Sequence, residues 1–464
     1  MSNNSSALTA LSPLDGRYRT SLPAVAQVFC EAELIKLRLH AEIEYLLFLS
    51  HNGLLPKCTK AHSASLRALV TNFSDKTALA IKDIERTTKH DVKAVEYYLT
   101  SELVKLKSPL SSYVHLCLTS EDINSIAYGI QLQVGLQTVV LPALRAGLAQ
   151  LRDLAAISAD AVMPARTHGQ LAIPTTMGKE LANFGVRLME ELQILENLPV
   201  SAKLTGAVGT FAAHHTTFPD ADWLALSSAF CASLGLKPEL FTTQIVPADS
   251  PARIFASLVR CNQILLDCSQ DLWRYCGDGY FNQKIAPGQV GSSTMPHKSN
   301  PIDFENAEGN LGLATSLLQH LGTKLAVSRL QRDLSDSTVK RSIGTSIGYC
   351  ELAYQSFVRG LKTLEANPAV MKADLADSYE ILAEPIQVLL RFHGDAQGYQ
   401  KLQQLAHGKK LSREDLQSWI NQLNVEESLR TQLLELKPET YVGLAPQLTQ
   451  LGIARVSEYL QGVS

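Results

Sequence analysis

The sequence lacks the patterns that would indicate a bound metal or a disulfide framework. Its eight cysteines form no CxxC pair and no Cys/His spacing suited to zinc. Cys261, Cys268 and Cys276 recur at intervals of seven and eight residues, which predicts small buried side chains on one face of a helix. We therefore expect no metal, reduced thiols and a cytoplasmic protein.

The chain also has little net charge and few signs of a targeting or membrane segment. Its 42 basic and 45 acidic side chains give a formal net charge of -3, so no bulk field indicates nucleic acid or a membrane surface as a partner. The N-terminal stretch has neither the basic region nor the apolar run of a secretory signal. The uncharged stretch 123–144 is long enough to span a bilayer, but its asparagine and glutamines predict a helix buried among other helices.

Strand-like alternation and internal repeats are absent too, whereas helical periodicity recurs along most of the 464 residues. Seams of apolar residues at spacings of three and four, from Leu141 to Leu151 and from Met177 to Leu195, predict long packed helices. Other helices are expected over residues 31–49, 61–72, 92–106, 250–284, 303–325 and 335–364. Breaks near Pro109 and Pro368 indicate three domains in an all-α fold: a helical N-terminal domain (1–110), a central long-helix domain (111–365) and a C-terminal helical domain (366–464).

The most unusual stretch is GSSTMPHKSNP, from Gly291 to Pro301, within a loop expected over 288–301. Its glycine and prolines prevent regular helix, and it lies between two long helical patterns. Lys298 and Asn300 supply a charge and an amide that could hold a carboxylate. This composition is typical of a mobile catalytic loop, although ordinary surface turns share it.

Two other polar segments precede expected helices. His90 and Asp91 follow two threonines and a lysine, an arrangement that suits a phosphate or carboxylate at a helix start, or a simple helix cap. Thr119 and Asp122 have the spacing of a capping box. Asn124 and the serine after it remain unexplained by that box, so we expect an anion-binding cradle there.

A histidine and a group of cations complete the candidate features. His168 lies in an irregular polar segment between two long helices, where it is either a solvated loop residue or a candidate acid or base. Further along the chain, a cationic cluster forms either a solvated face or a phosphate clamp: Arg329, Arg332, Lys340 and Arg341.

The segments TTKHD, TSEDIN, RTHGQ and GSSTMPHKSNP resemble, in this order, the motifs of the fumarase/aspartase superfamily, whose signature reads GSSxMPxKxNP. Their order and spacing are most similar to the adenylosuccinate lyase family, over nearly the full chain. The resemblance implies a three-domain all-α fold with a long central helical bundle shared in a homotetramer. It also implies β-elimination of fumarate from adenylosuccinate, giving AMP, and from the succinocarboxamide intermediate of purine biosynthesis (SAICAR), giving AICAR.

The resemblance further assigns roles to individual residues. Ser292 would be the general base and His168 the general acid. The residues that it implies for substrate binding are Arg17, Tyr18, Lys89, His90, Asp91, Thr119, Ser120, Gln244, Ser293, Lys298, Asn300, Asn306, Arg332, Ser337, Thr338 and Arg341. The expected partners are a purine nucleotide substrate and further copies of the same chain, with no cofactor, nucleic acid or membrane.

Two alternatives remain. Another fumarate-releasing lyase, such as argininosuccinate lyase, class II fumarase or aspartase, is the nearest, but Arg332, Ser337 and Arg341 would address a phosphate that those substrates lack. A non-catalytic helical protein that kept the fold is the second, and the presence of Ser292, His168 and Lys298 argues against it.

Overall fold

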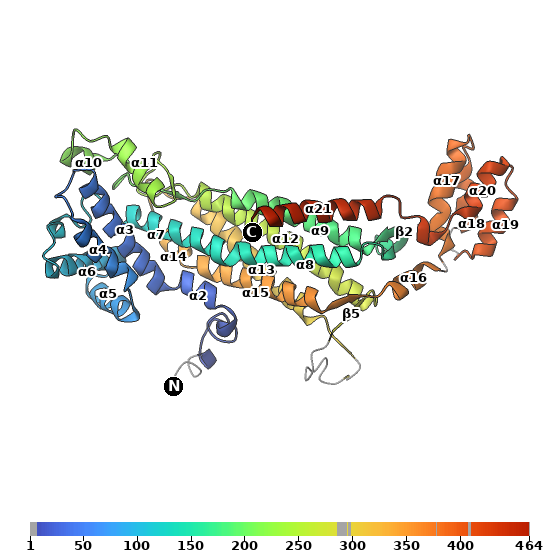
Figure 1. Cartoon of the computed structure of the whole chain (residues 1–464), viewed down its shortest axis with the longest axis horizontal. Helices are drawn as coiled ribbons and strands as arrows, with labels where there is room; N and C mark the ends of the chain where they lie inside the picture. Colours follow the sequence, from blue (N-terminus) through green and yellow to red (C-terminus); the bar gives the residue numbers. More distant parts are fainter. Residues whose placement is uncertain (1–6, 285–294, 296–297, 377, 407–409, 464) are drawn as a thin grey trace. The chain divides into compact units, whose positions relative to one another are not determined.

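The computed structural model describes residues 7–284, 295, 298–376, 378–406 and 410–463, which fold mostly into helices (Figure 1). They form two compact units, each built from three separate stretches of chain. The first comprises Met1–Ala143, Leu192–Asn262 and Asn310–Ala353, and the second Leu144–Glu191, Gln263–Gly309 and Tyr354–Ser464. The expected all-α class is confirmed, while the division into three consecutive domains stays a prediction.

The first unit packs the N-terminal helices against a buried helix, α7 (Ser120–Gly135). Its main contact is α3 (Glu31–His51), where Leu39, Ile43 and Leu46 are fully buried. The other helical elements of this unit are η1 (Arg19–Ser21), α2 (Pro23–Phe29), α4 (Lys60–Thr71), α5 (Asp75–Thr88), α6 (Asp91–Lys105), η2 (Ser111–Tyr113), α10 (Ala212–Thr217), α11 (Trp223–Ser233) and α14 (Ser335–Lys340). Among them α5 was not expected, because its many charged residues hide its short apolar stripe.

The stretch 123–144, expected to be one buried helix, consists of α7, a π-helical turn η3 (Leu136–Val140) and the start of α8 (Leu141–Ile157). Thr119 and Asp122 form the predicted capping box at its beginning. By length and composition alone, Ser120–Ile157 could cross a membrane, and half of its most apolar window is buried inside the protein. A core helix passes the same test, so composition does not decide between the two.

The second unit contains long helices and a small C-terminal bundle. In Figure 1, α17 (Ala383–Phe392), α18 (Gly398–Ala406), α19 (Arg413–Asn421) and α20 (Glu427–Glu435) gather together around a common apolar core. Also in this unit are most of α9 (Met177–Glu196), α16 (Pro368–Ala376), η4 (Tyr379–Leu382), η5 (Pro438–Thr440) and α21 (Ala445–Gly462). Among the described residues, five helices contribute to both units: α8, α9, α12 (Asp249–Gly277), α13 (Ile302–Leu325) and α15 (Ile343–Thr363).

Three small two-stranded sheets contradict the expectation that strands are absent. The antiparallel pair β1 (Val162–Thr167) and β2 (Gln170–Thr176) replaces the expected irregular segment around His168. The others are β3 (Ser201–Ala202) with β4 (Lys237–Pro238), and β5 (Phe281–Gln283) with β6 (Leu364–Ala366). The β1–β2 hairpin is buried at its base and exposed at its tip, so its strands carry no alternating pattern that the sequence could reveal.

Two expected helices end earlier or break. The helix expected over 250–284 ends at Gly277, and Gly279, with a φ of +76°, turns the chain into β5. The helix expected over 335–364 is divided into α14 and α15. On α12, Cys261 and Cys268 are buried as predicted, but Cys276 is only partly buried because it lies at the helix end.

Glycines in α9 offer a matched test of close helix packing. A Cβ on Gly178 would lie 2.6 Å from the Ala159 Cα, whereas one on Gly185 would meet nothing closer than 3.8 Å. We expect Gly178→Ala to lower the free energy of unfolding by about 1–3 kcal/mol through overpacking. Gly185→Ala, as the control, should raise it by up to about 1 kcal/mol because alanine favours helix. Guanidinium unfolding measures both, and equal stability of the two variants would contradict this packing.

Candidate active site

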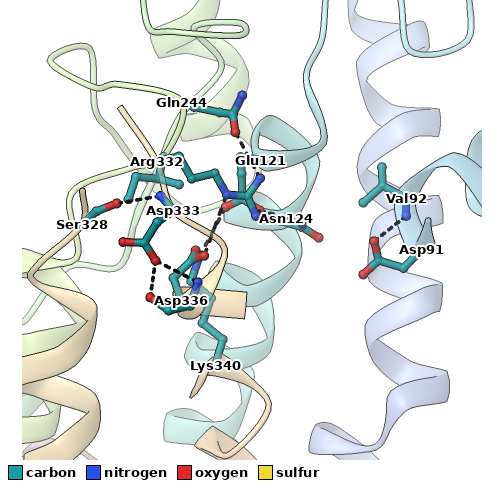
Figure 2. Close-up of polar contacts among 12 residues, drawn as sticks. Asp91, Val92, Glu121, Asn124, Gln244, Ser328, Arg332, Asp333, Asp336 and Lys340 are labelled. Atoms are coloured by element: carbon teal, nitrogen blue, oxygen red, sulfur yellow. Dashed lines mark hydrogen bonds and ion pairs between the residues drawn. The ribbon is translucent and has the colours of Figure 1, made fainter. Parts of the chain in front are cut away.

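Sequence segments that lie far apart meet in one polar network of the first unit (Figure 2). Its centre is Arg332, which precedes α14. Its NH2 lies 3.0 Å from the Glu121 Oε1 at the start of α7, and its NH1 donates to the Gln244 Oε1 at 3.2 Å. Three predicted segments of the chain are therefore joined through one guanidinium.

The network extends from Glu121 to the beginning of α6. The Asn124 Nδ2 donates to the Glu121 Oε1 at 2.8 Å, and the Asn124 Oδ1 accepts from the Arg38 Nε at 2.9 Å. The Arg38 NH2 in turn donates to the Asp91 Oδ2 at 2.7 Å. Asp91 is thus connected through buried polar groups to the segments that carry Glu121 and Arg332.

A second carboxylate, Asp336 in α14, completes the network. The Lys340 Nζ lies 2.7 Å from the Asp336 Oδ2 and 3.3 Å from the Glu121 Oε2. Burial by itself lowers the pKa of Lys340, but the two carboxylates outweigh it and raise that pKa, so the lysine stays charged. The Arg332 Nε and the Asp336 Oδ1 are buried 3.8 Å apart, each without a hydrogen-bond partner.

The charges of this network balance, since Arg38, Arg332 and Lys340 face three carboxylates, those of Asp91, Glu121 and Asp336. The expected single cationic cluster is therefore wrong as a unit. Arg332 and Lys340 are internal ion-pair partners, whereas the Arg341 and Arg329 side chains are 63% and 82% exposed. Arg341 lies 4.0 Å from Asp91, and its mostly exposed guanidinium faces solvent at the edge of the network.

The start of α6 is capped by its own side chains, as the simpler interpretation of the sequence held. The His90 Nδ1 accepts a hydrogen bond from the Lys93 backbone N–H at 3.3 Å, and the Asp91 Oδ1 accepts from the Val92 N–H at 2.9 Å. Acceptance at Nδ1 leaves the proton of a neutral His90 on Nε2, where it can donate to a ligand. Although burial raises the pKa of Asp91, Arg38 and the Val92 N–H lower it more, and the carboxylate stays ionised.

The start of α7 is arranged around Asp122, which is fully buried with Lys203. The Asp122 Oδ1 accepts from the Lys203 Nζ at 2.7 Å and from the Thr205 and Gly206 backbone N–H groups at 3.0 and 3.2 Å. The Asp122 Oδ2 accepts from the Thr119 N–H at 2.8 Å. These bonds hold the Thr119–Ser120 segment in place.

The anion cradle expected around Asn124 and Ser125 is wrong. Both side chains are buried and occupied by the protein itself: Ser125 donates to the Asp122 and Lys203 carbonyls, and Asn124 bridges Arg38 and Glu121. The carboxylates of Glu121 and Asp122 supply the negative charge that a helix N-terminus favours.

The remaining predicted residues lie elsewhere. His168 forms, with Gly169, the exposed two-residue turn of the β1–β2 hairpin, at φ values of 53° and 74°. It is carried by a hairpin rather than by two helices. Lys298 is exposed, Asn300 is partly buried, and the Asn306 Oδ1 on α13 accepts from the Ser356 hydroxyl at 2.6 Å.

The other predicted residues that the structure describes lie at the surface or on α14. The Arg17 guanidinium lies 5.9 Å from the centre of the Tyr18 ring. Lys89 is exposed in left-handed backbone (φ 55°) at the end of α5, and Ser337 and Thr338 belong to α14. Ser292 and Ser293 lie outside the described residues. Within the described part of the chain, no group of three or more His, Cys, Asp or Glu residues could hold a metal ion.

Three network residues, and Lys203 beside them, escaped the sequence analysis as site candidates; the three are Arg38, Glu121 and Asp336. For Arg38 a signal was present, because it stands with Glu42 at a spacing of four on the apolar face of α3, and both are buried. Ionisable residues on such a face require buried partners. The sequence did not indicate which partners.

Comparison with known proteins places these features in a family. Residues 16–314 match the family described as Lyase, and residues 328–442 match the family described as Adenylosuccinate lyase C-terminal. Adenylosuccinate lyase of Legionella pneumophila (strain Corby) is 43% identical over 450 residues, which cover 96% of this chain and 98% of the relative. Adenylosuccinate lyase of Escherichia coli (strain K12) is 42% identical over 446 residues, covering 95% and 98%.

Solved structures with lower sequence identity share the fold. A 3-carboxy-cis,cis-muconate lactonizing enzyme from Pseudomonas putida superposes with a TM-score of 0.76 at 21% identity, covering 94% of this chain and 97% of the other. A fumarate lyase from Mesorhizobium sp. BNC1 superposes with a TM-score of 0.75 at 17% identity, covering 93% and 97%.

The buried pair at the start of α7 generates a stability prediction. Lys203→Met would leave the Asp122 carboxylate buried without its cation, and we expect the free energy of unfolding to fall by about 3–5 kcal/mol. The control is Lys105→Met, which removes an exposed partner of Glu102 and should leave the unfolding midpoint nearly unchanged. Urea unfolding followed by circular dichroism compares them, and two equal midpoints would show that the buried pair contributes little.

Proposed function

The chain belongs to the adenylosuccinate lyase family of the lyases, and from this premise we propose that Ser292 and His168 carry out its reaction. That reaction is the β-elimination of fumarate from adenylosuccinate, giving AMP, and from SAICAR, giving AICAR. The observation that carries the substrate-binding part of the proposal is the Arg332 network, in which segments around Asp91, Glu121 and Gln244 meet although the sequence separates them widely. Such a connection holds polar groups in place before a substrate arrives.

In the proposed mechanism, Ser292 removes the carbon-bound proton next to a succinyl carboxylate. This step creates an aci-carboxylate with two negative charges, which Lys298, Asn300 and backbone N–H groups would stabilise more strongly than the ground state. A serine is a poor base in water, so it must act as an alkoxide in a site that excludes water.

His168 would then protonate the departing amino nitrogen as the C–N bond breaks. Histidine is suited to deliver a proton at neutral pH. Its exposed position at the tip of the β1–β2 hairpin supports this role, since the imidazole can be presented to a substrate.

The phosphate of the nucleotide would bind Arg341, with Ser337 and Arg332 nearby in sequence. Arg341 supports this assignment best, because its guanidinium is mostly exposed and its nearest carboxylate contact is long, at 4.0 Å. Arg332 is paired with Glu121, so its charge is already compensated. The other substrate-binding assignments follow the family motifs and stay proposals.

We also propose a cytoplasmic homotetramer with a shared helical core, in which each active site draws segments from three chains. Exposed apolar side chains on long helices support burial against further copies: Leu313 on α13, and Leu448 and Leu451 on α21. In this arrangement His168 and Ser292 of one site come from different chains.

The substrate class can be tested directly. We expect the purified protein to release fumarate from adenylosuccinate, and to leave argininosuccinate and malate unchanged because they lack the phosphate. Fumarate absorbance, with AMP identified by chromatography, measures the reaction. Comparable turnover of argininosuccinate would favour the alternative lyase, and that assignment would replace ours.

The shared site predicts recovery of activity between two inactive variants. His168→Ala and Ser292→Ala should each be inactive alone. After the two are mixed equally and reassembled, a site takes an intact His168 half the time and an intact Ser292 half the time, so about one quarter of the sites should work. Native mass spectrometry verifies mixing. Mixed tetramers that remain inactive would mean that both groups come from one chain.

A further inference from the structure

The β1–β2 hairpin that carries His168 depends on a contact with a carboxylate outside the family motifs. Its turn residues are exposed, and the His168 ring forms no hydrogen bond or ion pair with the described part of the chain. Two successive positive φ values form this turn, and such backbone strain in a residue other than glycine persists only where its surroundings hold it. The orientation of His168 is therefore determined by what anchors the strands below it.

Arg166, two residues before His168 on β1, provides a side-chain anchor. Its NH2 lies 3.5 Å from the Oδ2 of Asp374 on α16, a helix that packs against β1. The two side chains are 34% and 41% exposed. At this distance and exposure the ion pair alone would add little stability.

A buried tyrosine makes Asp374 a firm anchor. The Tyr280 hydroxyl donates to the same Asp374 Oδ2 at 2.8 Å, and Tyr280 is only 1% exposed, stacked on Tyr275. Burial, followed by the neighbouring carboxylate, raises the pKa of Tyr280, which keeps its hydroxyl protonated as a donor. The buried Tyr280 hydroxyl thus holds the Asp374 carboxylate in place, where it can form the ion pair with Arg166.

Tyr280 also stands directly before β5, the strand after which the chain continues towards Ser292. Its carbonyl accepts from the Asn367 N–H at 2.8 Å, and β5 pairs with β6 just before α16 begins. Within one chain, one carboxylate oxygen therefore joins the hairpin of the acid proposed for one site to the strand that leads to the base proposed for another site.

We propose that Asp374 is a positioning residue for the elimination reaction. Through Arg166 and Tyr280 it holds the His168 hairpin and strand β5 in a fixed position relative to each other. The kinetic part of this inference rests on the proposed function. In this proposal Asp374 acts through Arg166 and Tyr280 and not on the substrate, so its loss should change the orientation of the acid rather than the binding of the nucleotide.

The test compares Asp374→Asn with Asp395→Asn, a control that removes a carboxylate paired with Lys401 in the C-terminal bundle. We expect Asp374→Asn to lower kcat by about tenfold while KM changes less than about threefold, and the control to change neither. Asparagine can still accept from Tyr280, so the fold should be retained. A rise in KM with unchanged kcat, or a kcat equal to that of the control, would overturn the proposal.

A double-mutant cycle separates positioning from a general structural role. Arg166→Gln and Asp374→Asn should each lower kcat. Because both variants remove the same contact, the kcat of the double variant should fall no further than that of the less active single variant. Losses that multiply, or that follow the thermal unfolding temperature, would overturn the assignment.

Hydrogen exchange tests, independently of activity, whether Asp374 joins the hairpin to strand β5. In Asp374→Asn, backbone amides of both 162–176 and 281–283 should exchange faster than in wild type, whereas Asp395→Asn should leave both segments unchanged. Unchanged exchange in Asp374→Asn would overturn the inference even in an active enzyme. If wild-type protein released no fumarate from adenylosuccinate, the proposed function would fail, and exchange would still decide whether Asp374 joins the two segments.

Discussion

Two adjacent carboxylates at the start of α7, Glu121 and Asp122, are the constraint on which the first unit depends. Both are buried, and an ionised carboxylate taken out of water needs cations and hydrogen-bond donors around it. Lys203 reaches Asp122 from 81 residues away, and Lys340 reaches Glu121 from 219 residues away. Compensating these two charges therefore brings distant segments of the chain together.

The same compensation shapes what the site can offer a ligand. Arg38, Arg332 and Lys340 form ion pairs with carboxylates, which fix the positions of these cations and compensate their charge. Charge for an incoming anion must then come from cations at the edge of the network, of which Arg341 is an exposed example. The buried ion pairs therefore make the site rigid, whereas the exposed cations at its edge attract an anionic ligand.

The second unit arranges its proposed acid differently. His168 occupies a strained and exposed turn, and the order of the hairpin comes from contacts at its base, where Arg166, Asp374 and Tyr280 meet. None of these three belongs to the residues that the sequence marked as substrate-binding or catalytic. Rigid support from residues beyond the reacting groups is common in active sites, because small errors of orientation reduce rates strongly.

The sequence by itself determined the features that depend on neighbouring residues. The capping box of Thr119 and Asp122, the start of α13 and the long α9 follow from local hydrogen bonding and from apolar spacing, and the structure confirms them. Family membership also follows from the sequence, since short motifs in a set order identify it. The break between α14 and α15 escaped because the helical pattern of residues 335–364 continues across it. The β1–β2 hairpin escaped because its strands show no regular alternation.

Only the tertiary structure decided which charges pair. From the sequence, Arg332 and Lys340 were equivalent to Arg329 and Arg341, and all four could have bound phosphate. Folding buries the first pair beside Glu121 and Asp336 and leaves the second pair exposed. The physical reason is that desolvation acts on a group according to its three-dimensional surroundings, and these come from segments that the linear sequence keeps far apart.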